Sequence, residues 1–419
     1  MLPSRTARGF ARLENTPVYV VAGSDLVAFD VTNGEGRELF SEPVEFLEHC
    51  IVCGTTLIVP DMERLFALDY RSGELRWELE FEQARLIESL GVTEGVLHVS
   101  VQPAVPDGNS ELIGVEPLTG ARLFTRALDE RCLKPKPIDD QLLLMSVTDQ
   151  AASIERVDPL TGATTSQIDC RAALQPGMLE LRIDSLATRL YPQGMSGDAR
   201  HVYLPVDGRN QDDPRPQVLA LDGEGQLAWR WRGTAGMGLL MAQRRGDRFV
   251  VAEGSDQRSC RMVLLDSATG DELQSVDIGH DAAILNWERS WLHNPAPKTV
   301  AVGSEIDRQE HQRQLVCFAV DEGPSFAVPL RPTDGDVERE PLFGDGFVTF
   351  GVRPRRAGTP FRLYAVDLST RRGAFAGNTR DRPVASRGVP HGMTGAGPYT
   401  VLSTTQGLIV LGASAGENR

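Results

Sequence analysis

Short runs of apolar residues, each followed by an acidic residue and a turn that ends at Gly, recur along this chain. The clearest copy is Leu65–Trp77, LFALDYRSGELRW, with Asp69 after the apolar run and Gly73 four residues later. Alternating apolar positions rich in Val, Leu and Phe are typical of a half-buried β-strand. An Asp side chain accepts hydrogen bonds from amides just ahead of it, and Gly supplies the positive φ that reverses the chain. Each copy therefore predicts a β-hairpin.

Eight copies of this pattern span the sequence, and their acidic residues lie 39 to 64 residues apart. These eight repeat anchors are Asp30, Asp69, Glu116, Asp158, Asp222, Asp266, Asp321 and Asp367. In five copies the Gly follows the acid by four residues, whereas Asp222, Asp321 and Asp367 reach a Gly after three, two and six. We expect those three turns to differ in type. Another strand is predicted before most anchors, and these strands read VYVVAG, TLIVP, VLHVS, LLLMSV, HVYLP, RFVVAE, TVAVG, FVTFG and YTVLS.

Several antiparallel strands in every forty-odd residues, with no helical pattern of similar regularity, favour an all-β fold. A four-stranded sheet cannot bury both of its faces alone, so such units pack against their neighbours around an axis. The sequence predicts an eight-bladed β-propeller of four-stranded antiparallel blades, with seven blades as the alternative. We expect one domain over residues 1–419, closed by the N-terminal strand pair from Val18 and the C-terminal strands 399–411, because closure removes exposed strand edges.

The pattern [LV]-[YFV]-[AV]-[LFV]-D-x-x-[ST]-G-x-x-x-W resembles the repeat of the PQQ-like propellers. That group includes quinoprotein dehydrogenases and the BamB lipoprotein of outer-membrane barrel assembly. The full repeat is present at Asp69–Trp77, with a near match at Asp222–Trp229, and Phe124 and Phe375 replace the Trp elsewhere. The resemblance implies that Trp77 and Trp229 lock adjacent blades together. It indicates the fold strongly and the function weakly, because one fold supports many functions.

The formal net charge is −15, which disfavours general binding to nucleic acid because phosphates would be repelled. Residues 352–389 are the exception, with nine Arg against two acidic residues. These charges are either solvated strand and loop residues or a patch for an acidic partner. As candidate partner-binding residues within the segment we name Arg353, Arg355, Arg356, Arg371 and Arg372.

Irregular insertions interrupt the repeats near residues 170–200 and 280–298. The first is either an extended inner strand with a covering loop or a lid over one end of the ring. The second contains Trp287 and Trp291, which are four residues apart and fall on one side of either a helix or a strand. This pair is either core between blades or a site for a protein partner, since Trp is enriched at such sites.

The six Cys are scattered, which does not resemble a disulfide scaffold. The only metal-like spacing is His49, Cys50 and Cys53, and no second pair completes a zinc site, so we expect no metal. If this segment is a strand, Cys50 and Cys53 point to opposite faces. There is no apolar run of signal-peptide or membrane-span length. We expect a cytoplasmic protein, or a periplasmic one if a leader was removed.

No nucleophile, phosphate-loop or zinc-protease motif occurs, and no residue matches a quinone site, so we expect neither catalysis nor a cofactor. The leading hypothesis is a non-catalytic scaffold that binds a protein partner within a larger assembly. The first alternative is an enzyme or small-ligand binder with a site at the mouth of the central channel. Candidates for that site are His98, His201, His280, His391 and Arg182. The second alternative is binding of an anionic polymer through residues 353–387.

Overall fold

The computed structural model describes most of the β-strands of this chain and the turns that connect many of them. From residue 280 onward the description is limited to the backbone. The described residues are 18–22, 25–30, 37–44, 50–61, 64–81, 85–103, 110–128, 135–138, 141–147, 152–170, 195–206, 215–255, 258–284, 299–307, 312–319, 326–329, 335–337, 342–344, 347–354, 362–367, 372–378, 390–396, 399–404 and 407–412.

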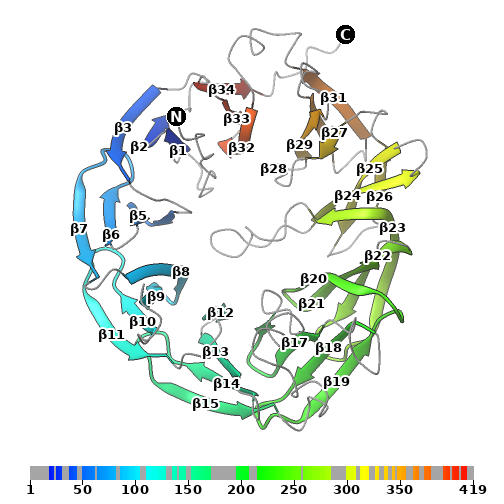
Figure 1. The fold of residues 1–419 in the computed structure, drawn as a ribbon, viewed down its shortest axis with the longest axis horizontal. Coiled ribbons are helices and arrows are strands. Elements are labelled where there is room, and N and C mark those ends of the chain that lie inside the picture. The colour runs from blue at the N-terminus through cyan, green and yellow to red at the C-terminus, as the bar shows by residue number, and fades with distance from the viewer. Residues whose placement is uncertain are drawn as a thin grey trace.

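The described elements are all β-strands, and every pairing between neighbouring strands is antiparallel. No helix in the described part of the chain has the length and apolar character needed to cross a membrane. The sheets follow one another around a common axis, which is the arrangement of a β-propeller (Figure 1). The strand nearest the axis in one sheet contacts its counterpart in the next, since β12 contacts both β8 and β16, and β16 contacts β20. The all-β prediction is therefore confirmed.

Four sheets have the predicted four strands, and their strands follow one another in chain order. They are β4 (Ile51–Cys53), β5 (Thr56–Asp61), β6 (Arg64–Asp69) and β7 (Leu75–Glu80); β8 (Arg85–Thr93), β9 (Val96–Pro103), β10 (Glu111–Val115) and β11 (Arg122–Ala127); β12 (Lys136–Ile138), β13 (Gln141–Val147), β14 (Ala152–Val157) and β15 (Thr164–Asp169); and β16 (Ser196–Gly197), β17 (Val202–Val206), β18 (Gln217–Leu221) and β19 (Leu227–Arg232).

A seven-stranded sheet follows, because one long strand belongs to two blade-sized units. Residues 272–279 of this strand, β23, pair with β22, whereas residues 280–284 pair with β24. Gly279 lies at the change of partner with a φ of 85°, a left-handed conformation that favours Gly. The irregular segment predicted from His280 therefore begins inside a strand. The sheet consists of β20 (Gly238–Arg245), β21 (Arg248–Ser255), β22 (Arg258–Asp266), β23 (Glu272–Ile284), β24 (Thr299–Asp307), β25 (Gln312–Ala319) and β26 (Phe326–Pro329).

Sheets at the two chain ends have three strands each, and a five-stranded sheet precedes the C-terminal one. The end sheets follow one another around the ring in Figure 1, but their described strands pair only within their own sheets. The predicted pairing of N-terminal with C-terminal strands is thus not present among the described strands. The three sheets are β1 (Val18–Ala22), β2 (Asp25–Asp30) and β3 (Arg37–Pro43); β27 (Gly335–Val337), β28 (Leu342–Gly344), β29 (Phe347–Pro354), β30 (Arg362–Asp367) and β31 (Arg372–Asn378); and β32 (Pro390–Ala396), β33 (Tyr399–Thr404) and β34 (Gly407–Gly412).

The cores of this protein lie between sheets. One apolar cluster joins Ile58 and Trp77 of the β4–β7 sheet to Leu97 and Val99 of the next sheet, and further clusters occupy the other described boundaries. The residues of β5, β17 and β18 are buried on both faces of the strand, because a neighbouring sheet covers each face. The prediction of half-buried strands is wrong for these strands. The outer strands β7 and β11 are mostly exposed.

A β-bulge at one equivalent position marks the outer strand of six described sheets or sheet units. In each, one residue of the fourth strand (the third in the N-terminal sheet) has no directly opposed partner. A bulge bends the strand and increases its twist, which suits a strand at the rim of a ring. The unopposed residues are Leu39, Arg76, Leu123, Thr165, Ala228 and Leu273.

Candidate functional site

Tight turns join the third and fourth strands of successive sheets, and they form one rim of the ring. The Asp69 carboxylate accepts hydrogen bonds from the amides of Arg71 and Ser72, both at 2.9 Å, while the Gly73 amide donates to the Asp69 carbonyl at 3.0 Å. Although burial opposes ionisation, the amides of Ser72 and Arg71 lower the pKa of Asp69 to about 2. The predicted turn chemistry is confirmed at this position.

The same turn recurs at Glu116, Asp158 and Asp266, where a Gly four residues later donates its amide to the acid's carbonyl. At Asp222 the Gly225 amide makes this bond from three residues away, so that turn is shorter, as predicted. Asp30 and Asp367 end strands β2 and β30. Asp321 lies outside the described residues.

Four of these turns pack against an aromatic side chain of the preceding sheet. A Cβ added to Gly120 would lie 2.7 Å from the Trp77 ring, and one on Gly270 would lie 2.5 Å from Trp229. Gly73 and Gly162 meet Phe40 and Phe124 just as closely, and Gly225 instead meets the Asp169 carbonyl and Ile168. All five turn glycines have φ between 70° and 81°. They are therefore required both for backbone conformation and for close approach.

The two Trp side chains also bond to the next turn. Trp77 Nε1 donates to the Pro117 carbonyl at 2.9 Å, and Trp229 Nε1 donates to the Ser267 carbonyl at 3.1 Å. The two acceptors are equivalent, since each follows the turn's acidic residue. Trp77 and Trp229 thus connect adjacent sheets, as the family resemblance implied.

The same rim exposes leucines. All the exposed large hydrophobic side chains of the described residues lie in these turns or at the start of the following strand. Single exposed leucines are ordinary on protein surfaces, but here they recur in pairs at three equivalent positions of successive hairpins. Leu118 and Leu160 lie two residues after the acidic anchor, Leu123 and Leu273 are the unopposed residues of the β-bulge, and Leu75 and Leu227 directly precede the bulge. The leucine rim, as we call this set, comprises Leu75 (59% exposed), Leu118 (55%), Leu123 (45%), Leu160 (55%), Leu227 (40%) and Leu273 (48%).

The sequence carries a signal for two residues of the leucine rim. The string Pro-Leu-Thr-Gly occurs twice, at residues 117–120 and 159–162. In both copies the Pro is buried and the Leu is exposed. The anchor and Gly of each turn have structural roles, so the exposed Leu is the position that the hairpin does not need.

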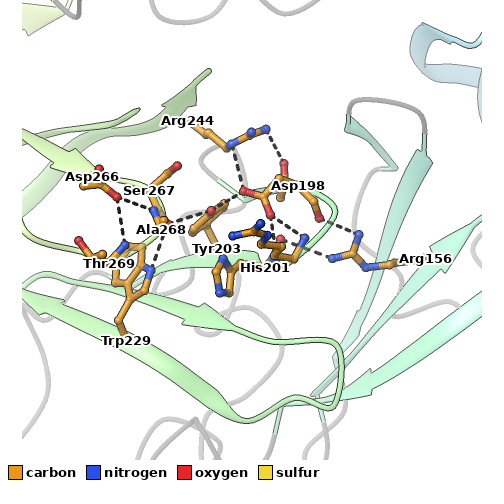
Figure 2. Close-up of polar contacts among 12 residues, drawn as sticks. Arg156, Asp198, His201, Tyr203, Trp229, Arg244, Asp266, Ser267, Ala268 and Thr269 are labelled. Atoms are coloured by element: carbon orange, nitrogen blue, oxygen red, sulfur yellow. Dashed lines mark hydrogen bonds and ion pairs between the residues drawn. The ribbon is translucent and has the colours of Figure 1, made fainter. Parts of the chain in front are cut away.

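A polar network links three sheets through Asp198 (Figure 2). Its Oδ1 accepts hydrogen bonds from the Arg200 and His201 amides at 2.8 Å, and Tyr203 donates to Oδ2 at 2.6 Å. Arg244 of β20 lies 3.6 Å from Oδ2. Burial, followed by the bond to Asp198, raises the pKa of Tyr203.

Arg156 of β14 completes this network from the other side. Its Nη1 donates to the Asp198 carbonyl at 2.9 Å and to Gln141 Oε1 at 3.2 Å. The network therefore ties the β12–β15, β16–β19 and β20–β23 units together. Arg244 and Tyr203 face the Asp198 carboxylate, whereas Arg156 faces the Asp198 carbonyl and Gln141, so these polar groups are held by one another and we assign the network a structural role.

Glu253 of β21 is a fully buried carboxylate and a natural candidate for chemistry. It accepts hydrogen bonds from the Thr234 amide at 2.9 Å and the Thr234 hydroxyl at 2.7 Å, and it forms an ion pair with Arg261. Its oxygens are thus occupied by groups of the protein. We assign it a structural role.

The predicted partner-binding residues fall mostly beyond the structural description. Trp287, Trp291, Arg355, Arg356 and Arg371 lie outside the described residues. Arg353 and Arg372 lie on β29 and β31, where only the backbone is described. Their roles stay predictions.

The candidate residues of a channel-mouth site belong to different sheets. His98 is buried on β9, and His201 packs on Tyr203 with 6.0 Å between ring centroids. His280 and His391 lie on β23 and β32, and Arg182 lies outside the described residues.

Cys50 and Cys53 pack into different clusters on opposite sides of their sheet, as predicted for a strand. Burial raises the pKa of Cys50 to about 12, which makes its thiol unreactive. Within the described ranges, no three His, Cys, Asp or Glu side chains are grouped so that they can hold a metal ion.

A family model described as outer membrane protein assembly factor BamB matches residues 61–376. This chain belongs to that family. The match begins at Asp61, near the end of β5, and reaches β31, so it includes seven of the eight repeat anchors. No curated protein sequence matches the chain.

Solved structures show the same fold at low sequence identity. A eukaryotic initiation factor is 10% identical, with 90% of this chain and 89% of that chain covered and a TM-score of 0.55. The dihydro-heme d1 dehydrogenase NirN in complex with DHE is 13% identical, with coverage of 89% and 75% and a TM-score of 0.51. BamB from Moraxella catarrhalis is 14% identical, with coverage of 97% and 98% and a TM-score of 0.41. An initiation factor and a dehydrogenase share this fold, so the fold alone does not specify the function.

We predict that Trp77→Phe lowers the free energy of unfolding by about 1–3 kcal/mol, because it leaves the buried Pro117 carbonyl without its donor. Urea unfolding followed by Trp fluorescence or circular dichroism measures the loss. Trp229→Phe should give a similar loss, and Leu75→Ala, at an exposed position two residues before Trp77, should stay within about 0.5 kcal/mol. Unchanged stability in both Phe variants would contradict the role assigned to these bonds.

We also predict an acid-dependent loss of stability from His98. Burial lowers its pKa from 6.5 to about 4. Above pH 6.5 the ring is neutral in both states; between pH 6.5 and 4 only the unfolded state takes up the proton. Stability should fall by about 3 kcal/mol over this interval. His98→Phe should remove this part of the pH dependence in urea titrations at pH 7 and 4.5, and equal slopes in both proteins would refute the assignment.

Proposed function

We propose that this protein is a non-catalytic β-propeller scaffold that binds a protein partner through the leucine rim. The observation that carries the proposal is the recurrence of exposed Leu at three equivalent hairpin positions over successive sheets. Apolar side chains held on rigid turns bind a partner at little entropic cost, because their backbone is already ordered.

The chemistry of the described residues supports a binding role. The half-buried carboxylate of Asp198 and the buried carboxylate of Glu253 are hydrogen-bonded within the protein, and the buried arginine Arg156 donates to the Asp198 carbonyl and to Gln141. A catalytic carboxylate needs a face open to substrate. Family membership agrees with this role, since the family is described as an assembly factor of outer membrane proteins. We therefore propose a partner within a larger protein assembly.

We propose further that the ring has eight blades, one for each repeat anchor, and that it closes where the β1–β3 and β32–β34 sheets follow one another. Closure would protect the strand edges at both chain ends. It would also hold the leucine rim in a fixed curve, which a partner surface can match.

The test compares three forms of the full chain in native extracts of its source: wild type, Leu118→Ser with Leu160→Ser, and Leu118→Met with Leu160→Met. Met keeps the apolar surface, whereas Ser removes it at exposed positions that contribute little to folding. We expect wild type and the Met variant to migrate in a complex larger than the 45.8 kDa chain on native gels, and the Ser variant to migrate alone.

A complex that survives the Ser substitutions, or its absence in all three forms, would contradict binding through the leucine rim. A complex retained by all forms and dissolved by moderate salt would instead indicate an anionic partner at the Arg-rich segment 353–387. Thermal unfolding of each variant checks that the ring itself is unchanged.

A further inference from the structure

Three polar side chains of the β8–β11 sheet are buried without partners. Thr93, His98 and Ser100 are 3%, 4% and 1% exposed. The two hydroxyl oxygens and the ring nitrogens of His98 make no hydrogen bond of good geometry, although the Thr93 backbone lies close enough to one ring nitrogen to oppose the lowering of the His98 pKa. At least one ring nitrogen is thus left without a protein partner. Folded proteins pair nearly all such groups with protein atoms or with ordered water.

Strand register places these side chains at the boundary with the next sheet. His98 is opposite Gly91 on one side and Gly114 on the other. Leu97 and Val99 on the other face of β9 contact the β4–β7 sheet. The face that carries His98 also carries Leu112 and Phe124, which pack against Leu142 and Leu144 of the β12–β15 sheet. The Phe124 ring covers Gly114 and lies 6.2 Å from the His98 ring.

The repeat supplies its own comparison. In the four other sheets or sheet units whose side chains are described at this position, the residues equivalent to His98 are Ile58, Leu143, Tyr203 and Val250. Only Tyr203 among them is polar, and its hydroxyl is satisfied. It donates to Asp198 at 2.6 Å and lies 3.0 Å from the Ser267 carbonyl.

Asp198 and Thr93 are themselves equivalent, since each lies two residues after the residue paired with Tyr203 or His98. The β16–β19 sheet therefore completes this position with a phenol and a carboxylate. At the same place the β8–β11 sheet has the His98 imidazole and the Thr93 hydroxyl. An imidazole side chain is shorter than a tyrosine side chain, so it does not reach the place of the phenol oxygen. Gly91 beside them contributes no side chain to fill the difference.

We propose that an ordered water molecule occupies the place of the Tyr203 hydroxyl in the β8–β11 sheet, bridging a His98 ring nitrogen and Thr93 Oγ1. The Ser100 hydroxyl, on the same face of β9, lines the same hydrated site. A buried water typically makes two to four hydrogen bonds to groups that would otherwise be unpaired, which is what this set offers. One imidazole and two hydroxyls carry no net charge when the ring is neutral, so the site suits a neutral ligand rather than an ion.

A crystal structure of the wild-type chain tests the proposal directly. We expect a water within about 3.2 Å of a His98 nitrogen and of Thr93 Oγ1. Absence of that water in well-defined density, or protein atoms hydrogen-bonded to both ring nitrogens, would overturn the proposal.

A solution measurement gives a second, independent test. Oxygen-17 magnetic relaxation dispersion counts long-lived buried waters. His98→Tyr supplies the hydroxyl that the water replaces, so it should hold at least one fewer such water than wild type. Thr125→Val, at an exposed position on β11, the outer strand of the same sheet, is the control and should leave the number unchanged. Equal numbers in wild type and His98→Tyr would refute the proposal, and the crystal structure decides alone if that variant does not fold.

Discussion

The contact between an aromatic ring and the turn Gly of the next sheet is the constraint on which this structure depends. A Cβ on Gly73, Gly120, Gly162 or Gly270 would overlap the ring of the preceding sheet. Only a residue without a side chain allows that distance, and the same residue also supplies the positive φ of the turn. The turn and the boundary between sheets therefore form together. Trp77 and Trp229 each add a hydrogen bond to this contact, and that bond fixes the position of one sheet relative to the turn of the next.

The same geometry sets what the protein presents to its surroundings. The acidic anchor binds the amides of the turn, and the Gly meets the ring, so both are unavailable to a partner. Leu118 and Leu160, which lie between the acidic residue and the Gly of their turns, are exposed. The partner surface that we propose is thus formed by the repeat itself rather than by an inserted loop.

Much of the fold could be predicted from the sequence, because period-2 apolar alternation and Asp-to-Gly spacing are local signals. All nine strands predicted before or beside the anchors are present as β-strands. Burial of β5, β17 and β18 on both faces was not predicted. An alternating apolar pattern indicates burial of one face of a strand, whereas the second face is buried by a neighbouring sheet that the local sequence does not reveal. The shared strand β23 was missed for a similar reason: no residue pattern marks a change of pairing partner except Gly279.

The candidate site was less predictable. His98 was a candidate for the channel mouth, but the strand register places it on the face of β9 that packs against the β12–β15 sheet. The sequence around His98 does not show which face of the strand meets which neighbouring sheet. The leucine rim was missed because each Leu resembles a core residue until the hairpin around it is built. Trp287, Trp291 and most of the named arginines lie outside the described residues, so their predicted role is unchanged.

A double-mutant cycle between Trp77 and Gly120 measures the central contact most directly. Gly120→Ala introduces the overlap in the wild-type background, whereas in a Trp77→Leu background only the cost of the positive φ remains. The account predicts a coupling free energy of about 1 kcal/mol or more between the two substitutions, since residues in contact are not additive. An equal loss of stability from Gly120→Ala in both backgrounds would show that the ring and the Gly do not meet, and it would contradict the account.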